Sequence, residues 1–354
     1  MTFREIPKSI ALTIMAFPGD GDSYTECHYQ AMRNQGARIV SGIFSVRWLL
    51  KNLRGVDFVH FHWPSFSYRH VSRVHSAVRF MRLCFVFMLA KSYGASIIWT
   101  AHNLYPHDRN SWPVLDVFAR RILTRLATHV FAHGPSAARI VATEFPATRG
   151  KLTEIWHGHW IDYYKHGCSR QAAKAKFNIP NDAYVYAFIG MCKYYKNLHE
   201  LIPTFQSMPG TAWLVITGRF QDTAYQRQIE NLIAEKPDRI QFVAGYVPDD
   251  DLQYYFAASD IVVMPYLEIL TSGSAMLALS FGRPVVAPRR GFLKDVIVPN
   301  VGLLYDTGDK NGFRTAMADA QALRFDEAEI LKHVRQYDWD SSARTVINVL
   351  KKHS

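Results

Sequence analysis

The sequence predicts an α/β protein built from two Rossmann-like, doubly wound domains that face a cleft. Its 354 residues suggest two domains, because one domain commonly holds about 100–200 residues. Short apolar runs alternate with segments of helical length, which is typical of parallel sheets covered by helices. This alternation pauses in a mixed, polar stretch at 166–182, which we expect to be a linker with a short helix, and then starts again. We therefore expect domains at 1–166 and 167–338, followed by a helix at 339–354 that packs back toward the first domain.

Strands of the first domain are expected where a short, apolar, β-branched run meets a glycine, a proline or a polar loop. Helices are expected between them, and glycine ends two of these segments. The expected strands lie at 10–17, 56–62, 95–101, 128–132 and 152–156, and the expected helices lie at 24–35, 69–92, 114–127 and 136–144.

The second domain repeats the same alternation, and a last helix is expected at 339–351. Its expected strands lie at 183–189, 212–217, 240–243, 261–265, 284–287 and 301–305, and its expected helices lie at 198–206, 223–235, 249–258 and 274–281. Ligands of open α/β sheets bind at the carboxyl ends of the strands. Both domains are therefore expected to present their loops to the shared cleft.

The charge is uneven along the chain. Residues 1–166 carry 20 Lys and Arg against 10 Asp and Glu, whereas residues 167–354 carry 21 against 20. The first part also holds 12 of the 15 histidines. A basic half joined to a nearly neutral half indicates a surface that meets something anionic, and a second half with another task.

Composition excludes several classes of protein. Hydrophobic residues make up 49% of the chain and aromatic residues 14%, which argues against disorder. The longest apolar stretch, 83–90, is far shorter than the roughly 20 residues that span a bilayer. The first residues include Glu5 and lack a small-residue cleavage site, so no signal peptide is expected. The four cysteines have no paired spacing, which favours free thiols in a reducing cytosol.

The segment 265–288 contains a strand, a loop and a helix in direct succession. The loop is Leu-Thr-Ser-Gly-Ser at 270–274. A helix N-terminus offers free backbone N–H groups and the positive end of the helix dipole, which suit a diphosphate. Gly273 would let the ligand approach the backbone closely. An ordinary capped turn is the alternative interpretation, because Ser and Thr are common N-caps.

A second candidate anion site lies at 190–197. Gly190 ends the first strand of the second half, and Lys193 and Lys196 follow it closely. Lysines beside a strand end can hold phosphate charge, although a solvated, lysine-rich loop is the alternative for either lysine alone. Two such loops in one domain favour a phosphate-bearing ligand.

These blocks resemble the donor-binding half of GT-B glycosyltransferases, especially the large retaining family with a Glu-x7-Glu motif. The resemblance covers residues 183–310. It is carried by FIGMCKYYKN at 188–197, ITGRF at 216–220, VAGYVPDDDLQYYFAASDIVVMPYLE at 243–268 and FGRPVVA at 281–287. The resemblance implies that Lys196 is the phosphate-binding lysine. The expected donor-binding residues are Gly190, Lys193, Lys196, Arg219, Tyr246, Glu268, Thr271, Ser272, Gly273 and Ser274.

The chain departs from the family at the motif itself. Leu277 and Ile269 stand where the two glutamates are expected, and Glu268 lies one position away. Met191 replaces an arginine, and Asn197 replaces a glycine. The sequence of residues 272–288 is more similar to that of a divergent branch found among bacterial polysaccharide glycosyltransferases. Retention and inversion of configuration therefore both stay open.

The first half carries a weaker resemblance to the same enzymes. DFVHFHWP at 57–64, WTAHNLYPHD at 99–108 and IWHGHWID at 155–162 resemble three of their sequence blocks. By this likeness His102 lies near the donor sugar, and the family generally needs no catalytic metal. His60 and His62 lie on one face of a strand, but a zinc site normally has three or four ligands. We expect histidines that line a cleft or fill a core, and no metal or other cofactor.

Transfer with inversion requires a general base that faces the acceptor. The candidates at strand ends of the first half are Asp20, Asp22, His62, His102 and Asp108. Asp22 is favoured because it lies in a glycine-rich loop at the expected cleft edge. The alternative is that Asp20 and Asp22 only shape a turn. Glu268 is a further catalytic candidate by its nearness to the motif.

Two helices of the basic half combine arginines with apolar side chains. Such helices suit an interfacial position on an anionic membrane, although a solvated arginine face is the ordinary alternative. The expected acceptor or membrane residues are Arg79, Arg82, Trp112, Arg121 and Arg125.

The resemblance implies a metal-independent hexosyltransferase. Its donor would be a nucleoside-diphosphate sugar, with GDP-mannose the first candidate by resemblance. Its acceptor would be a polysaccharide or a glycan on polyprenyl diphosphate, at the inner face of the cytoplasmic membrane. A nucleotide-sugar epimerase of the same fold and a basic nucleic-acid-binding protein are the alternatives. Salt-sensitive DNA or RNA binding would favour the last.

Overall fold

The computed structural model describes residues 11–107 and 112–353, which form two compact α/β units. Unit 1 comprises residues up to Gly158 together with Asp338–Ser354, and unit 2 comprises His159–Tyr337. Residues 159–166, which the sequence analysis placed with the first domain, thus belong to unit 2. By these boundaries the net charge of +11 falls entirely on unit 1, because unit 2 holds 19 basic and 19 acidic residues.

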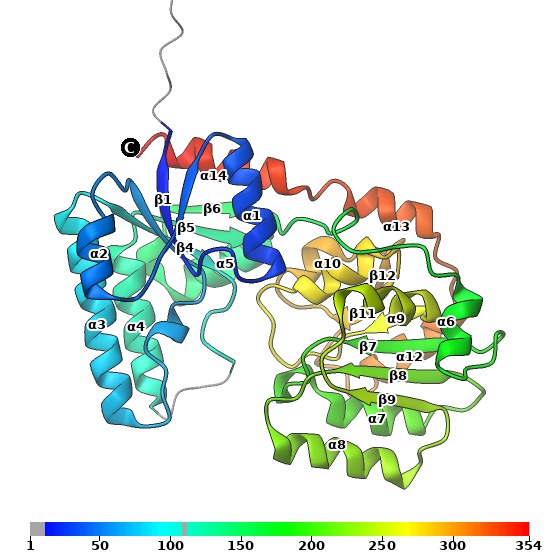
Figure 1. Ribbon diagram of the computed structural model, residues 1–354. Helices are drawn as coiled ribbons and strands as arrows, with labels where there is room; N and C mark the ends of the chain where they lie inside the picture. Colours follow the sequence, from blue (N-terminus) through cyan, green and yellow to red (C-terminus); the bar gives the residue numbers. More distant parts are fainter. Residues whose placement is uncertain (1–10, 108–111, 354) are drawn as a thin grey trace, which may run out of the picture. The chain divides into compact units, whose positions relative to one another are not determined.

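Unit 1 is built on a parallel sheet of order β2-β1-β3-β4-β5-β6 (Figure 1). Most of its strands are buried apolar runs, as the sequence predicts. The strands are β1 (Thr13–Phe17), β2 (Arg38–Ser41), β3 (Phe58–Phe61), β4 (Ser96–Ala101), β5 (His129–His133) and β6 (Leu152–Ile155). The helices are α1 (Ser23–Asn34), α2 (Val46–Asn52), α3 (Arg73–Ser92), α4 (Pro113–Leu126), α5 (Gly134–Glu144) and α14 (Trp339–Leu350), with short 3₁₀ turns at Pro64–Ser67 and Pro146–Thr148.

The last helix, α14, completes the core of unit 1 (Figure 1). Its apolar face, which includes Val346 and Leu350, is fully buried and packs in one cluster with Tyr29 and Met32 of α1. Ser342 Oγ accepts a hydrogen bond of 3.0 Å from the backbone N–H of Trp156, just after β6. A segment distant in sequence therefore supplies one wall of this core.

Unit 2 contains a second parallel sheet of order β12-β11-β10-β7-β8-β9. Its strands are β7 (Val185–Ile189), β8 (Trp213–Gly218), β9 (Ile240–Ala244), β10 (Ile261–Val263), β11 (Val285–Pro288) and β12 (Gly302–Tyr305). Its helices are α6 (Arg170–Lys176), α7 (Leu198–Gln206), α8 (Thr223–Glu235), α9 (Leu252–Ala258), α10 (Gly273–Ser280), α11 (Leu293–Val296), α12 (Gly312–Ala322) and α13 (Glu327–Val334), with 3₁₀ turns at Tyr194–Lys196 and Asp249–Asp251.

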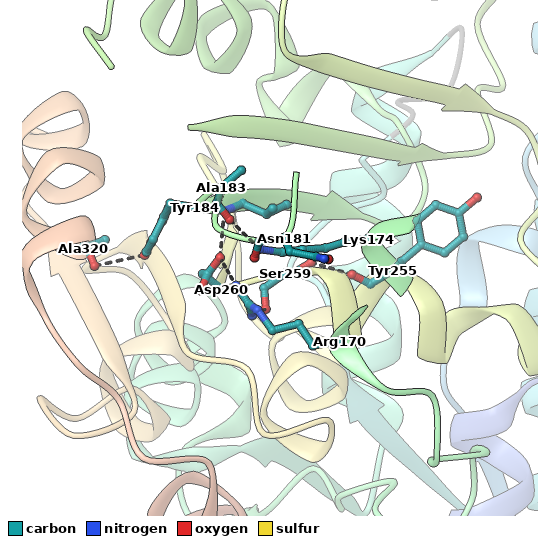
Figure 2. Close-up of polar contacts among 10 residues, drawn as sticks. Arg170, Lys174, Asn181, Ala183, Tyr184, Tyr255, Ser259, Asp260 and Ala320 are labelled. Carbon is teal, nitrogen blue, oxygen red and sulfur yellow. Dashed lines mark hydrogen bonds and ion pairs between the residues drawn. The ribbon is translucent and has the colours of Figure 1, made fainter. Parts of the chain in front are cut away.

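Helix α6 is anchored at the amino ends of β7 and β10 (Figure 2). One carboxylate oxygen of Asp260 accepts hydrogen bonds from the guanidinium of Arg170 at 2.5 Å and from the N–H of Val185 at 2.8 Å. The ammonium of Lys174 donates to the carbonyls of Asn181 and Ala183 at 2.8 and 2.6 Å. The polar stretch expected to be a linker is therefore fixed to unit 2, at the end of the sheet opposite the strand-end loops.

Within the part of the chain that the structure describes, no helix is both long enough and apolar enough to cross a bilayer.

Candidate active site

The order of strands in unit 2 brings the two predicted anion-binding loops together. The chain runs from β7 outward to β8 and β9, and then crosses to β10 on the other side of β7. Such a switch point is where ligands of open α/β sheets bind. Because β7 and β10 pair in parallel, the loops at their carboxyl ends are neighbours. The N–H of Leu267 donates to the carbonyl of Tyr195 at 2.8 Å and joins the two loops.

Lys196 lies at the centre of this region. Its side chain is almost fully buried, and its ammonium lies 3.4 Å from Ser274 Oγ in the first turn of α10. The same ammonium lies 5.1 Å from the ring centroid of Tyr266. Among residues 11–107 and 112–353, no carboxylate forms an ion pair with it. A buried cation without a counter-charge is costly to maintain, so this position suits an anionic ligand.

The electrostatic setting keeps Lys196 charged. Burial alone lowers the pKa of the ammonium, but charge interactions with Tyr266 and Tyr195 and a hydrogen bond to Tyr266 outweigh this effect. The net pKa lies above the ordinary value for lysine. Lys196 is therefore a cation throughout the neutral pH range.

Backbone conformation explains which residues can stand in these loops. Gly190 has a φ of +133°, and a Cβ at this position would lie 3.3 Å from the Lys196 ammonium and 3.4 Å from Ser274 Oγ. Asn197 has a φ of +61°, in the left-handed region that glycine and asparagine adopt most readily. Asn197 therefore adopts a turn that also suits the glycine expected at this position by resemblance.

The start of α10 holds both the residue that caps the helix and a residue that faces Lys196. Ser272 is the N-cap, and its hydroxyl accepts the N–H of Ala275 at 3.1 Å, as the ordinary interpretation of this turn predicted. Ser274 Oγ faces Lys196 instead. Gly273 is the first helical residue. Thr271, directly before the N-cap, is half-buried.

The other predicted donor residues lie farther from this centre or are more exposed. Glu268 and Tyr246 are exposed, and the hydroxyl of Tyr246 donates to Asp249 at 3.5 Å. Lys193 is half-buried. Arg219 is exposed after β8, and its carbonyl accepts the N–H of Cys192 at 2.9 Å.

In unit 1 the two candidate carboxylates also hold the backbone in place. Asp22 caps α1, and its Oδ1 accepts the N–H groups of Tyr24 and Thr25 at 2.9 and 3.0 Å. Asp20 forms an ion pair of 2.5 Å with Arg33. Both aspartates are exposed. Asp108, a third candidate, lies outside the described residues.

A cluster of buried histidines occupies the carboxyl end of the sheet in unit 1. His60 and His62 come from the end of β3, and the hydroxyl of Tyr29 on α1 lies 3.2 Å from His60 Nδ1 and 2.8 Å from His62 Nε2. His62 Nδ1 lies 2.9 Å from His102 Nε2. The other members are His28 on α1, His133 at the end of β5 and His157 after β6.

Burial keeps these imidazoles neutral. The pKa of His28 is lowered to about 3, first by burial and then by the charge of His157. Burial likewise lowers the pKa of His157 to about 4 and holds the pKa of His102 well below its ordinary value. Both ring nitrogens of His28 are buried and find no hydrogen-bond partner in the part of the chain that the structure describes. Each unsatisfied group costs about 1–3 kcal/mol of folding free energy.

Comparison with known proteins identifies the family. Residues 169–351, slightly more than half of the chain, match the family described as glycosyl transferases group 1. The chain belongs to this family. Its two parallel sheets form the two α/β domains of the GT-B glycosyltransferase fold, as the sequence predicted.

Relatives of this glycosyltransferase include mannosyltransferases. It is 26% identical over 267 residues to a GDP-mannose:glycolipid 4-beta-D-mannosyltransferase of Xanthomonas campestris pv. campestris, a match that covers 74% of this chain and 70% of the relative. A protein of the same description from another strain matches over 69% of this chain and 64% of its own length. The Escherichia coli O-antigen chain mannosyltransferase B is 26% identical over 46% of this chain and 45% of that protein.

Solved structures show the same fold at low identity. HepE of Anabaena, in complex with UDP and glucose, has a TM-score of 0.70 and 14% identity, with 97% of this chain and 100% of that chain covered. Sucrose-phosphate synthase of Thermosynechococcus elongatus has a TM-score of 0.68 and 19% identity, with 87% and 75% covered.

The glycosyltransferase also has a stripe of exposed apolar side chains on α3. These side chains recur every three or four residues and so share one helix face. They are Val74, Val78, Met81, Phe85 and Met88. On α4, which contacts α3, Val114 and Phe118 are exposed, as is Trp112 at the helix start. We call these eight residues the α3–α4 apolar face.

The predicted basic residues near this face differ in exposure. Arg82, Arg121 and Arg125 are exposed. Arg79 is half-buried and donates to the carbonyl of Arg69 at 3.0 Å. Arg120 is buried and donates to the carbonyl of Leu104 at 2.9 Å, so its charge points inward.

Sequence reasoning missed several residues that the structure brings into these sites. Tyr24, His28 and Tyr29 lie on the buried face of α1, and the helical spacing of 24 and 28 was the available signal. The contact of Ser274 and Tyr266 with Lys196 depends on strand pairing and has no local signal. The apolar stripe of α3 was detectable as a period of three to four residues.

Proposed function

We propose that this glycosyltransferase moves a mannosyl unit from GDP-mannose to a glycolipid acceptor at the inner face of the cytoplasmic membrane. The single observation that carries the donor side is the ammonium of Lys196, which is buried beside the first turn of α10 and forms no ion pair with a carboxylate of the described residues. Together they supply positive charge and free backbone N–H groups. A nucleoside diphosphate is the ligand that this arrangement suits, and its release as a leaving group would be stabilised there.

The choice of mannose and of a lipid-linked acceptor is supported by the relatives. Two of them are described as GDP-mannose:glycolipid 4-beta-D-mannosyltransferases, and a third as an O-antigen chain mannosyltransferase. We propose that the acceptor glycan is carried on polyprenyl diphosphate and that the product enters an exopolysaccharide or a related glycan. UDP-sugars are the second donor class.

The membrane position is supported by the surface of unit 1. The α3–α4 apolar face exposes eight large apolar side chains, and the whole net charge of +11 belongs to the same unit. Apolar side chains can enter the headgroup region, while Arg82, Arg121 and Arg125 attract anionic lipids.

The anomeric configuration of donor and product decides whether the reaction requires a general base. An α-linked donor that yields a β-linked product requires inversion, and inversion requires a general base. We propose Asp22 as this base, with Asp20 second, because the capping bonds of Asp22 engage Oδ1 and hold an exposed carboxylate in a fixed position. His102 is a weaker base, because burial lowers its pKa. Glu268 stays the candidate for a retaining reaction.

We further propose that the diphosphate needs no divalent metal, since Lys196 and α10 provide the positive charge. A screen of GDP-mannose, GDP, UDP-glucose and ADP-glucose by thermal shift tests the donor. A donor that binds only the folded chain raises the melting temperature, and GDP-mannose should give the largest rise, unchanged by Mg²⁺. Absence of a shift with every nucleotide would overturn the proposal.

The epimerase alternative predicts a different product. An epimerase consumes the nucleotide sugar without an acceptor, whereas the transferase releases GDP only when a lipid-linked acceptor is present. Measuring GDP release with and without a polyprenyl-diphosphate glycan therefore separates the two functions.

A further inference from the structure

Three histidines of unit 1 form a compact group. His28, His60 and His62 each offer one ring nitrogen, and these three nitrogens lie within 4.8 Å of one another. All three side chains are buried. His28 comes from α1, whereas His60 lies in β3 and His62 directly follows this strand, so the group joins a helix to the sheet.

His28 provides an independent observation that points to a ligand. Its side chain is fully buried, and neither ring nitrogen has a hydrogen-bond partner among residues 11–107 and 112–353. Buried polar groups in folded proteins are nearly always paired. Its ring centroid lies 5.9 Å from that of His60 and 5.6 Å from that of His62. One ring nitrogen of His28 also lies within 4.8 Å of a ring nitrogen of His60 and of His62, so a nitrogen of this imidazole borders the group.

The remaining hydrogen bonds have the pattern of ligand-orienting contacts. His60 Nδ1 and His62 Nε2 both face the hydroxyl of Tyr29, at 3.2 and 2.8 Å. The opposite nitrogens are held from outside: His60 Nε2 lies 2.8 Å from Thr100 Oγ1, and His62 Nδ1 lies 2.9 Å from His102 Nε2. Metal-binding histidines are oriented in the same way, with the second nitrogen held by an outer partner.

We propose that His28, His60 and His62 bind one divalent transition-metal ion, with Zn²⁺ the first candidate. Imidazole ligands suit Zn²⁺ and its neighbours in the transition series, whereas Ca²⁺ and Mg²⁺ require oxygen ligands. One ring nitrogen of each histidine is the ligand atom, and the Tyr29 hydroxyl, which contacts both His60 and His62, borders the site. Because all three side chains are buried, the ion has a structural role that fastens α1 to β3.

This proposal replaces the expectation of no metal. The sequence displayed only the pair His60 and His62, which is too few for a zinc site. The third ligand lies more than 30 residues earlier on α1, and only folding brings it to the pair.

The test uses the full chain without a histidine tag, stripped of metal and then dialysed against micromolar ZnSO₄. Elemental analysis should find about one zinc per chain, and the zinc-loaded chain should melt at a higher temperature than the stripped chain. His28→Phe should reduce the retained zinc at least tenfold and abolish the rise in melting temperature. His133→Phe is the matched control, because His133 is equally buried but lies outside the group, and it should retain the ion.

Two results would overturn the proposal: wild-type chain that retains no zinc, or a folded His28→Phe variant that retains as much as wild type. If His28→Phe fails to fold, X-ray absorption at the zinc edge of the wild-type complex decides instead. Three imidazole ligands are expected there. Sulfur ligands, or a single imidazole, would assign the ion to another part of the chain.

Discussion

The ammonium of Lys196 lies 3.4 Å from Ser274 Oγ, although 78 residues separate the two in the chain. The contact exists because β7 and β10 are adjacent parallel strands. It combines the two loops that the sequence presented as separate candidates into one cationic site at the switch point of the sheet.

Replacement of this lysine should weaken donor binding. Lys196→Ala removes the buried cation and the charge-assisted hydrogen bonds it can form, which are worth roughly 1.5–3 kcal/mol. We expect the Kd for GDP-mannose to rise about 10- to 100-fold, as measured by calorimetry. Lys332→Ala, at an exposed position of α13, serves as the control. An unchanged Kd in Lys196→Ala would remove this residue from the donor site.

Removal of the proposed base should affect turnover more than binding. Asp22→Asn keeps an oxygen that can accept the capping bonds of α1 but cannot accept a proton. We expect kcat to fall about 10²- to 10⁴-fold, with the Kd for the donor and the melting temperature nearly unchanged. Asp20→Asn should have a smaller effect, because Asp20 is paired with Arg33. Full activity of Asp22→Asn would exclude an essential role as a base.

Charged substitutions on the α3–α4 apolar face should release the protein from lipid. Met81→Glu combined with Met88→Glu places two anions on the exposed stripe, where apolar burial and anionic lipids both oppose them. Sedimentation with anionic vesicles should show at least a tenfold loss of binding. Leu323→Glu, at an exposed apolar position of unit 2, should bind as wild type does.

The arginines of α4 offer a second measurement on the same surface. Arg121→Gln with Arg125→Gln should weaken binding to anionic vesicles most at low salt, because screening already suppresses their contribution at high salt. If neither the two glutamate substitutions nor the two glutamine substitutions change vesicle binding, this face is not the membrane surface.

The buried histidines predict a loss of stability in mild acid. Burial lowers the pKa of His157 to about 4, so the unfolded chain takes up a proton at higher pH than the folded chain does. The contribution of His157 is therefore complete above about pH 6.5 and is lost as the pH falls toward 4, at up to about 1.4 kcal/mol per pH unit. Urea unfolding of His157→Gln between pH 7.5 and 4.5 should show a shallower decline than wild type.

Some elements left no clear signal in the sequence. Strand β2 was not predicted, because this edge strand is only partly buried and so lacks an apolar run. Helix α2 was also missed, since it is short and no side chain caps its start. The segment expected as a linker proved to be anchored through Arg170 and Asp260, a pairing of residues 90 positions apart.

The sequence by itself determined the local features of this glycosyltransferase. Alternating apolar runs specify strands and helices, Gly190 and Asn197 specify turns with positive φ, and the composition concentrates positive charge in one unit. The order of the strands decided which distant residues meet in a site, because a parallel sheet brings the carboxyl ends of its strands to one edge whatever their separation in the chain. Tertiary structure alone therefore joined Lys196 to Ser274 and placed His28 beside His60 and His62.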